Sequence, residues 1–510
     1  MKTKYTAWAA AAASLLVAAC GGGGSDSATG TQNSNPGRGE LMQSPPLRVT
    51  SLTAADYNAR LNGSTTGQGL LTLSTGSPTG SVPCGIDVQY LKYGTVGANG
   101  EATTASAVLM VPTGTAARCT GARPIVLHAH GTAVEQRYNM ADFTDSTNPG
   151  YNESQVIAAM YASQGYIVVA PNYAGYDISN LGYHPFLVAS QQTKDMLDAL
   201  TAAKAALPTL LTPTTASGKI YVSGYSQGGY VALATHKAMV TDPATVTKLA
   251  SLGLTIRGSA PMSGPYALKN FGDQIVGGAV NAGSTQLLPM LLTGYQKSYG
   301  NVYTSTGDLY ESAYVTGIES NFPGPLSSSN LVANGKVPQL ALFATGSLPA
   351  APTGQPLSPL WSLGFGTPNL IKSSFRTAYL TDAATNNANP QNGLRIGLKT
   401  NDLTVNMPSP VGATLLCGGG NDPTVYYSTN TSALKSSWTT NAPSTTAAAV
   451  TEVNMDLNSS GAVSNPAFSS LQTAFTSANP TSSATFASTY HSALVPFCVR
   501  AARGFFDLVN

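Results

Sequence analysis

Charged residues are scarce in this sequence. Asp, Glu, Lys and Arg make up 9% of the 510 residues, whereas about a quarter is usual for a soluble protein. The formal net charge is only +2 and no basic patch stands out, so the sequence does not indicate a nucleic-acid partner. Polarity comes instead from Ser, Thr, Asn, Gln, Gly and Tyr, a composition that suits a secreted protein better than a cytosolic one.

The usual signatures of metal and nucleotide sites are also missing. The five cysteines form no C-x-x-C pair, and none of the five histidines belongs to an H-E-x-x-H motif, which argues against a zinc site. There is no Walker-type Gly-x-x-x-x-Gly-Lys-Ser/Thr loop. The glycine run 418–420 leads to an acidic residue, so we do not interpret it as a phosphate cradle. We expect neither a metal nor another cofactor.

Residues 1–19 predict a targeting segment outside the fold. Two lysines precede an apolar run over residues 7–19 that is too short for an ordinary membrane span. Small residues directly before Cys20 are typical of a bacterial lipoprotein signal, cut before a lipid-bearing cysteine; an ordinary signal peptide cut at the same place is the alternative. Residues 20–46 predict a flexible tether. We therefore expect export and a lipid anchor at the outer membrane or cell surface, with no other membrane contact.

Four cysteines remain when Cys20 is set aside. Four cysteines allow three pairings, and in an oxidising compartment we favour disulfides between Cys84 and Cys119 and between Cys417 and Cys498. Buried free thiols are the alternative. The second disulfide would join the two segments to which a catalytic acid and base are assigned below.

Apolar runs alternate with helical patterns along most of the chain. This rhythm predicts a mostly parallel sheet with helices on both faces, and residues 47–111 predict β structure that opens the sheet with antiparallel strands. The expected strands cover residues 85–93, 105–111, 124–130, 166–173, 219–225, 252–260, 412–417 and 450–455. The expected helices cover residues 155–163, 190–206, 230–239 and 494–508.

Residues 266–407 interrupt the rhythm. They are rich in Gly, Pro, Asn and Tyr and hold helix-like pieces at 277–299 and 308–319. A connection of this length between neighbouring strands is uncommon, so we interpret it as a cap, or lid, inserted over the active site. The core is thereby divided into residues 47–265 and 408–510.

The most informative stretch is a Gly-x-Ser-x-Gly turn with Ser226 at its centre. It joins the expected strand 219–225 to a helical pattern over 230–239. Such a turn exposes the serine hydroxyl at the carboxyl edge of a sheet, and the next helix directs its N-terminal dipole at the charge that develops during acyl transfer. We predict that Ser226 is a nucleophile; an ordinary strand–helix turn is the alternative.

A serine nucleophile needs a base, and elimination among the five histidines points to His491. His236 lies on the helix that leaves the turn, about 15 Å along its axis. His128 and His130 flank the end of a strand, and His184 does not follow one. His491 stands in a polar loop just before the last helix, where the order serine, acid, histidine requires the base. A loop or helix-cap histidine is the alternative.

The base in turn needs a carboxylate to fix its tautomer. Asp422 follows the expected strand 412–417 on a Gly-rich loop, which makes it the leading candidate. An Asp before Pro is also common in turns and at helix N-caps. Asp402 and Asp456 are alternative acids.

The tetrahedral intermediate of acyl transfer needs backbone N–H donors. Gln227, directly after the nucleophile, should supply one. Thr132 should supply the other, in a His130-Gly131-Thr132 turn after the strand 124–130. A tight strand exit without a catalytic role is the alternative.

With these residues in place, the chain resembles the α/β-hydrolase superfamily. Within it, the chain is similar to secreted bacterial esterases and lipases with a large cap, related to the secretory lipase group. The stretches that carry the resemblance are residues 169–176, 224–229, 417–425 and 490–498. The resemblance implies an α/β-hydrolase fold and ester substrates, which are acyl esters, lipids or polyester oligomers, since some relatives hydrolyse polyesters. Peptide cleavage and a non-catalytic surface lipoprotein are the alternatives, and the oligomeric state stays open.

Overall fold

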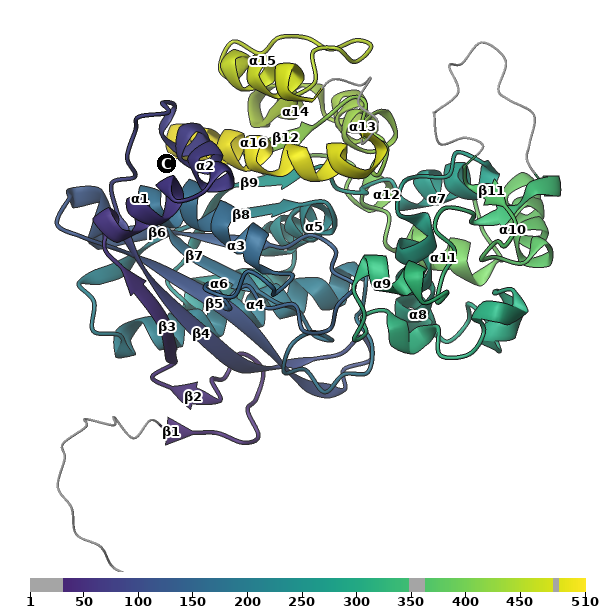
Figure 1. The fold of residues 1–510 in the computed structure, drawn as a ribbon, viewed down its shortest axis with the longest axis horizontal. Coiled ribbons are helices and arrows are strands. Elements are labelled where there is room, and N and C mark those ends of the chain that lie inside the picture. The colour runs from purple at the N-terminus through teal and green to yellow at the C-terminus, as the bar shows by residue number, and fades with distance from the viewer. Residues whose placement is uncertain (1–30, 348–362, 480–485) are drawn as a thin grey trace, which may run out of the picture.

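The computed structural model describes residues 31–347, 363–479 and 486–510. The predicted signal segment, Cys20 and the first part of the tether lie outside these residues. A nine-stranded sheet with the order β13-β12-β9-β8-β6-β7-β5-β4-β3 forms the centre of the molecule (Figure 1). Its strands are β3 (Leu47–Leu52), β4 (Gly85–Val96), β5 (Ala102–Thr113), β6 (Gly121–Ala129), β7 (Ile167–Pro171), β8 (Thr214–Tyr225), β9 (Thr255–Met262), β12 (Thr414–Gly418) and β13 (Val450–Asn454).

The sheet is parallel from β7 to β13 and antiparallel at its other end. β7, β6, β8, β9, β12 and β13 all pair in parallel, whereas β3, β4 and β5 pair antiparallel and β5 joins β7. Every residue of β7 and β12 is buried, because a parallel strand is covered on both faces. The predicted mixed sheet with an antiparallel beginning is confirmed.

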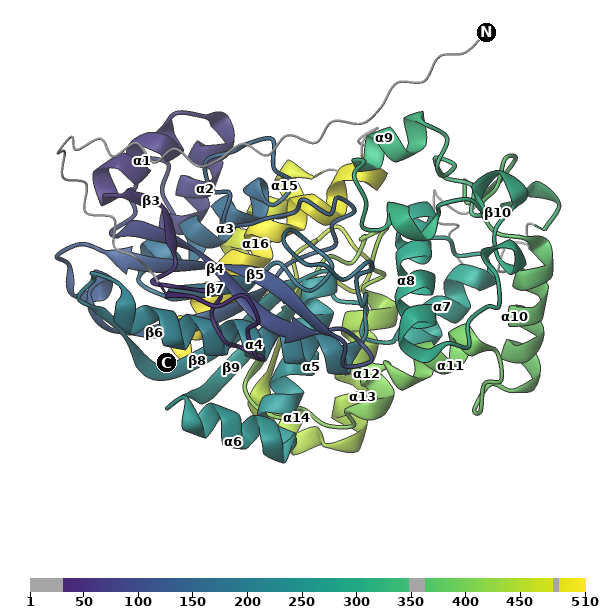
Figure 2. The ribbon, with the colours of Figure 1, turned by 90° about the horizontal axis from the view of Figure 1, so that it is seen from below.

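Helices cover both faces of the sheet, as the alternating pattern predicts. α4 and α5 pack on one face, with α6 beside α5, and α3 and α16 pack on the other, with α2 against them (Figures 1 and 2). These helices are α2 (Thr65–Thr75), α3 (Tyr151–Met160), α4 (Ala189–Ala206), α5 (Gln227–Thr241), α6 (Pro243–Ser251) and α16 (Phe486–Leu508). α13 (Ala433–Asn441), α14 (Pro443–Ala449) and α15 (Ser469–Ala478) complete the carboxyl-terminal part.

Two helices stand where the sequence predicts only β structure. α1 (Ala54–Asn62) and α2 follow β3 directly. Thr53 and Asp56 form a capping box, in which each side chain accepts a hydrogen bond from the other residue's backbone N–H, and this arrangement starts a helix. Tyr57 and Leu61, one helical turn apart, are buried, so the apolar spacing there is helical rather than alternating.

The segment between β9 and β12 folds into a group of helices at one end of the molecule, drawn in green in Figure 1. Its elements are α7 (Leu268–Gly277), α8 (Ser284–Tyr299), α9 (Ser328–Ala333), β10 (Phe343–Ala344), β11 (Phe365–Gly366), α10 (Ser373–Thr385), α11 (Gly393–Thr400) and α12 (Leu403–Asn406). We call this group the inserted helices.

Two helix predictions within this segment are wrong in part. The piece predicted over 277–299 begins only at Ser284, because Gly278 and Gly283 adopt positive φ angles of 129° and 84° that end one helix and precede the next. The piece predicted over 308–319 forms only short 3₁₀ turns. Gly317 there has a φ of 75°, which a continuous helix does not permit.

Both expected disulfides are present. Cys84 bonds to Cys119 across 35 residues, and Cys417 bonds to Cys498 across 81 residues. The second disulfide joins β12 to α16, so it connects the strand that leads to Asp422 with the helix that carries His491. None of the helices in the described parts of the chain is both long and apolar enough to cross a bilayer.

Candidate active site

Ser226 lies on a sharp turn between β8 and α5. β8 ends at Tyr225 and α5 begins at Gln227, and Ser226 between them has φ 59° and ψ −124°. A residue with a side chain rarely adopts such angles, and they occur where a functional group must be presented. The Ser226 N–H donates to the Met262 carbonyl at 2.9 Å, which holds the turn against the end of β9.

At two positions of the turn only glycine fits, because a side chain would collide with the backbone. A Cβ atom on Gly228 would lie 1.9 Å from the Ala129 carbonyl oxygen, and one on Gly224 would lie 2.1 Å from the Gly228 carbonyl oxygen. Both distances are far below van der Waals contact, so a side chain at either position would push the turn away from β6. The Gly-x-Ser-x-Gly spacing therefore follows from the close approach of the turn to the strand that precedes Thr132.

His491 and Asp422 form a hydrogen-bonded pair. The Nδ1–H group of His491 donates to Oδ2 of Asp422 at 2.6 Å. The other oxygen of Asp422 accepts the backbone N–H groups of Thr424 at 2.9 Å and Val425 at 3.2 Å. The Asp422 side chain is completely buried and the His491 side chain is 17% exposed. This pairing places the proton of the neutral imidazole on Nδ1 and leaves Nε2 as an acceptor.

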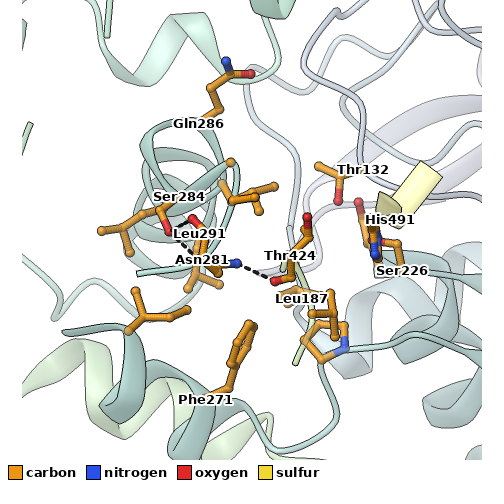
Figure 3. A pocket seen from close by; sticks show the side chains of 18 of the residues that line it. Thr132, Leu187, Ser226, Phe271, Asn281, Ser284, Gln286, Leu291, Thr424 and His491 are labelled. Atoms are coloured by element: carbon orange, nitrogen blue, oxygen red, sulfur yellow. Dashed lines mark hydrogen bonds between the residues drawn. The ribbon is translucent and has the colours of Figure 1, made fainter. Parts of the chain in front are cut away.

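The His491 ring lies against the turn that carries Ser226. The hydroxyl of Tyr225 donates to the His491 carbonyl at 2.7 Å, and the two rings lie 5.0 Å apart. Nε2 of His491 is buried and has no hydrogen-bond partner among the described residues. Ser226, His491 and Thr132 lie together at one end of a pocket that all three line (Figure 3). Nε2 is thus available to the serine hydroxyl.

The structure corrects the local setting of His491. The sequence predicts a loop before a helix at 494–508, but His491 lies within α16, which spans Phe486–Leu508. Tyr490, Leu494 and Cys498 are buried along one face of that helix, at the four-residue spacing of a helical stripe. Burial of this stripe stabilises the helix despite the Ser and Thr residues that weaken its local propensity. The histidine is therefore held on a regular element.

The two alternative acids have other roles. Asp402 caps α12, where its side chain accepts the N–H groups of Thr404 and Val405. Asp456 accepts the Tyr490 hydroxyl at 2.6 Å and the side-chain amide of Asn421 at 2.9 Å. Neither acid contacts the His491 ring, so Asp422 is the acid that the fold pairs with it.

The other four histidines are buried and do not line the pocket themselves: His128, His130, His184 and His236. Burial lowers the pKa of His130 and of His236 to about 4. Burial also lowers the pKa of His184 to about 3. These three rings stay neutral and enclosed at neutral pH. Within the described residues, no group of three or more His, Cys, Asp or Glu side chains is arranged to hold a metal ion.

Both expected oxyanion donors line the same pocket as Ser226 and His491. Gln227 is the first residue of α5, so its N–H has no partner within the helix. Its side-chain amide donates to Nε2 of His184 at 2.6 Å, and Nδ1–H of His184 donates to the Ala174 carbonyl at 2.9 Å. A buried neutral histidine therefore anchors the side chain of the residue after the nucleophile, a role that the sequence does not indicate.

The pocket extends from Ser226 into the inserted helices. Its volume is about 490 Å³, within the range of sites that enclose a small molecule. α7, α8 and α11 supply most of its apolar wall, with Phe271 and Leu291 facing it in Figure 3. The apolar lining residues of these three helices are Leu268, Phe271, Ile275, Val276, Leu287, Leu288, Leu291, Leu394 and Leu398.

The connection between α7 and α8 is tied to the loop that carries Asp422. The side-chain amide of Asn281 donates to the Thr424 carbonyl at 2.6 Å (Figure 3). The N–H of Ala282 donates to the Pro423 carbonyl at 2.9 Å. Asn281 comes from the early part of the long inserted segment, between α7 and α8. No local motif marks it, so only the tertiary structure reveals this contact.

We compared the chain with known proteins. No protein-family model and no curated protein matches the sequence. Among solved structures, the rice cell wall degrading esterase LipA from Xanthomonas oryzae is similar, with 25% identity, a TM-score of 0.65, and coverage of 92% of this chain and 98% of LipA. A second structure of that esterase gives 26% identity and a TM-score of 0.66. The chain has the α/β-hydrolase fold.

A protein from Legionella pneumophila shares this fold at greater distance. It is 18% identical, with a TM-score of 0.62, and the match covers 91% of this chain and 96% of that one. The resemblance to the α/β-hydrolase superfamily, based on Ser226, Asp422, His491 and the His130-Gly131-Thr132 turn, is confirmed for the fold.

Proposed function

We propose that this α/β-hydrolase is a serine carboxylester hydrolase. The observation that carries the proposal is the Asp422–His491 pair, whose Nε2 has no partner among the described residues and whose ring lines the same apolar pocket as Ser226. A nucleophile, a base oriented by a carboxylate and adjacent N–H donors are the parts that acyl transfer requires. The esterase LipA, which shares the fold over nearly its whole length, supports ester bonds as the substrate.

In the proposed reaction, Ser226 attacks the ester carbonyl while Nε2 of His491 takes the hydroxyl proton. Asp422 stabilises the imidazolium that forms, and the N–H groups of Thr132 and Gln227 bind the oxyanion. The intermediate collapses to an acyl-enzyme as His491 gives the proton to the departing alkoxide. Water, deprotonated by His491, then attacks the acyl-enzyme, and His491 returns the proton to the Ser226 oxygen as its bond to the acyl carbon breaks and the carboxylic acid leaves.

We propose that residues 266–407 act as the cap of the site and hold the acyl part of the substrate. The pocket leads from Ser226 between α7, α8 and α11, and its wall there is apolar. Burial of a methylene group stabilises binding by about 0.8 kcal/mol, so each carbon that reaches this wall should improve binding. We therefore expect acyl chains longer than acetate to be preferred.

The alternatives receive less support from the site. A peptidase that binds a free amine needs an acid facing the substrate, but Glu153 is the one acidic side chain among the described pocket residues, and three donors already occupy it. Glu311 and Glu319, two acids of the segment 266–407 that could be considered for binding such an amine, do not line the pocket. A purely binding lipoprotein would have no need of a His491–Asp422 pair beside the turn that carries Ser226.

The test is hydrolysis of nitrophenyl esters from acetate to palmitate, with emulsified triglyceride and a solid aliphatic polyester alongside. Ser226→Ala is the control and should lose about 10⁶-fold in kcat, as removal of a triad nucleophile does. Activity that survives in Ser226→Ala, or a wild type inactive on every ester, would contradict the proposal. Activity on the polyester would extend it to polymers, and its absence would restrict it to small esters and lipids.

We also propose that Cys20 carries a lipid that anchors the enzyme at the outer membrane or cell surface. The two disulfides are in keeping with an oxidising compartment outside the cytoplasm. Metabolic labelling with a radioactive fatty acid should mark the wild type and leave Cys20→Ala unlabelled. Equal labelling of the two, or none of either, would contradict the anchor.

A further inference from the structure

Glu153 lies behind the loop that contains Thr132. It stands in the first turn of α3, on a different element from any residue of the proposed mechanism, and its side chain is 17% exposed. It is the one acidic side chain among the described residues that line the active-site pocket. A carboxylate beside an oxyanion site is unexpected, because its charge opposes the negative charge of the intermediate.

Both oxygens of Glu153 are occupied by donors from the oxyanion side of the site. The Gly131 N–H donates to both oxygens at 3.2 Å. The Tyr138 hydroxyl donates at 3.0 Å and Nε2–H of His128 at 3.1 Å. Burial alone would raise the pKa of Glu153, but these hydrogen bonds and the neighbouring histidines lower it below the usual value. The group is an ionised acceptor at neutral pH.

The peptide group between Gly131 and Thr132 is held through its carbonyl oxygen. Nδ1–H of His130 donates to the Gly131 carbonyl at 2.5 Å, and the His130 ring is stacked between Tyr138 and Tyr173 at 4.3 and 4.1 Å. Because a trans peptide is planar, the N–H of Thr132 points away from the Gly131 carbonyl. The direction of the Thr132 N–H is therefore set by the bonds that Gly131 makes.

Gly131 also lies close to the nucleophile. The point at which a Cβ atom of Gly131 would stand lies 3.8 Å from Oε2 of Glu153 and 3.9 Å from Cβ of Ser226. The carboxylate and the serine thus both lie near Gly131. A shift of the Gly131 amide by a fraction of an ångström would turn the Thr132 N–H away from the oxyanion.

We propose that Glu153 is a positioning residue, whose carboxylate anchors the Gly131 amide so that the Thr132 N–H points at the oxyanion. The inference rests on the proposed esterase function and deepens it. It also predicts the direction in which kcat changes when the charge of Glu153 is removed. If the charge of Glu153 merely repelled the intermediate, its removal would raise kcat; if the carboxylate anchors the loop, removal lowers kcat.

The test compares Glu153→Gln with Glu452→Gln. Glu452 is a matched control outside the pocket: its side chain is 20% exposed and accepts the Tyr427 hydroxyl at 2.7 Å and the Lys435 ammonium at 2.9 Å. For Glu153→Gln we expect kcat to fall roughly tenfold to hundredfold, less than the loss of a whole oxyanion donor, with KM changed by less than about twofold. Glu452→Gln should leave kcat unchanged.

A second readout separates positioning from general damage to the fold. An alkyl boronic acid forms a tetrahedral adduct with the serine and is held by the oxyanion donors, so its inhibition constant reports transition-state binding. In Glu153→Gln this constant should rise by the same factor by which kcat/KM falls. Tyr138→Phe removes one donor to Glu153 and keeps the stacked ring. In this variant kcat/KM should fall, and the boronate inhibition constant should rise, by only a few-fold.

The outcomes distinguish this inference from the proposed function. An unchanged or raised kcat in Glu153→Gln, or a lower kcat with an unchanged boronate constant, would overturn the positioning role while the esterase stands. If Glu153→Gln does not fold, an unchanged kcat and boronate constant in Tyr138→Phe would overturn it. A wild type without esterase activity would overturn both.

Discussion

The hydroxyl of Tyr490 donates a hydrogen bond of 2.6 Å to the carboxylate of Asp456. The same carboxylate oxygen accepts the side-chain amide of Asn421. Tyr490 directly precedes His491, and Asn421 directly precedes Asp422, so one buried acid connects the two chain segments that meet in the site. Asp456 thus supports the pair from behind and does not replace either member.

Asp422→Asn and Asp456→Asn should therefore differ widely. The first removes the acceptor that holds the His491 tautomer and should lower kcat by about 10⁴. The second keeps the shape of a support that does not contact the ring, and should lower kcat by about tenfold or less, with a stability loss of about 1–3 kcal/mol from imperfect hydrogen bonding. Steady-state kinetics and thermal unfolding measure both. Equal losses of kcat would make Asp456 an equal partner of the histidine.

The two disulfides should contribute similarly to the stability of the fold but unequally to catalytic activity. Their sequence separations are 81 and 35 residues, so loop-closure entropy predicts losses of about 4.5 kcal/mol without Cys417–Cys498 and about 3.8 kcal/mol without Cys84–Cys119. Only the Cys417–Cys498 disulfide ties β12 to α16. Replacing Cys417 and Cys498 by Ser should lower kcat even at temperatures well below the unfolding temperature of the variant.

The Cys84→Ser, Cys119→Ser double variant is the control for that experiment. It should unfold at a similarly lowered temperature and keep the wild-type kcat in the cold. A loss of kcat of the same size in both double variants would mean that the effect comes from general loosening of the fold.

The buried histidines should make the fold acid-sensitive. Burial lowers the pKa of His236 from an ordinary 6.5 to about 4, so between these values the unfolded chain binds a proton that the folded chain does not. Stability is then fully present above pH 6.5 and falls as the pH drops toward 4, by up to about 1.4 kcal/mol per pH unit for each such histidine.

Thermal unfolding at pH 4.5, 5.5 and 6.5 measures this slope. His236 lies outside the pocket and its Nδ1 contacts the Ser259 hydroxyl at 2.7 Å. His236→Gln should lose less stability than the wild type over the same interval, since one of the titrating groups is gone. A slope that is unchanged in His236→Gln would show that other groups cause the acid sensitivity.

Arg395 should matter for long acyl chains more than for short ones. Its buried guanidinium donates to Asp273 at 3.0 and 3.1 Å and to Asp382 at 2.7 Å, and so connects α7, α10 and α11. Leu394 and Leu398 beside it line the pocket. Lys cannot reproduce these forked bonds, so Arg395→Lys should lower the unfolding temperature and reduce hydrolysis of decanoate and longer esters more than that of acetate.

Arg137→Lys is the control for this substitution. Arg137 pairs with Glu135 at 2.9 Å, but its side chain is 53% exposed, and exposed pairs contribute about 0–1 kcal/mol. The ratio of long-chain to short-chain activity should not change in Arg137→Lys. A ratio that is equally unchanged in Arg395→Lys would argue that the inserted helices do not hold the acyl chain.

The sequence by itself determined what local chemistry can express. The turn around Ser226 can be predicted because a strand, a tight Gly-x-Ser-x-Gly turn and a helix are consecutive in the sequence. The residue types are visible locally, although the close approach of Gly228 to Ala129 in β6 explains why glycine is needed there. The order of strands and helices predicted the sheet for the same reason, since each apolar period reflects burial of one segment. Elimination among the histidines predicts His491 as the base, and the predicted loop around it is wrong, because His491 lies within α16.

Only the tertiary structure decided which groups meet. Asp422 and His491 are 69 residues apart, and the choice of Asp422 over Asp402 and Asp456 depends on which carboxylate the packing of α16 against β12 brings to the ring. Glu153 and Asn281 carry no local signature, because a single side chain that bonds a distant backbone amide or carbonyl leaves no periodic pattern in its own segment. Such contacts arise from the closing of long loops, and a sequence read one segment at a time does not contain them.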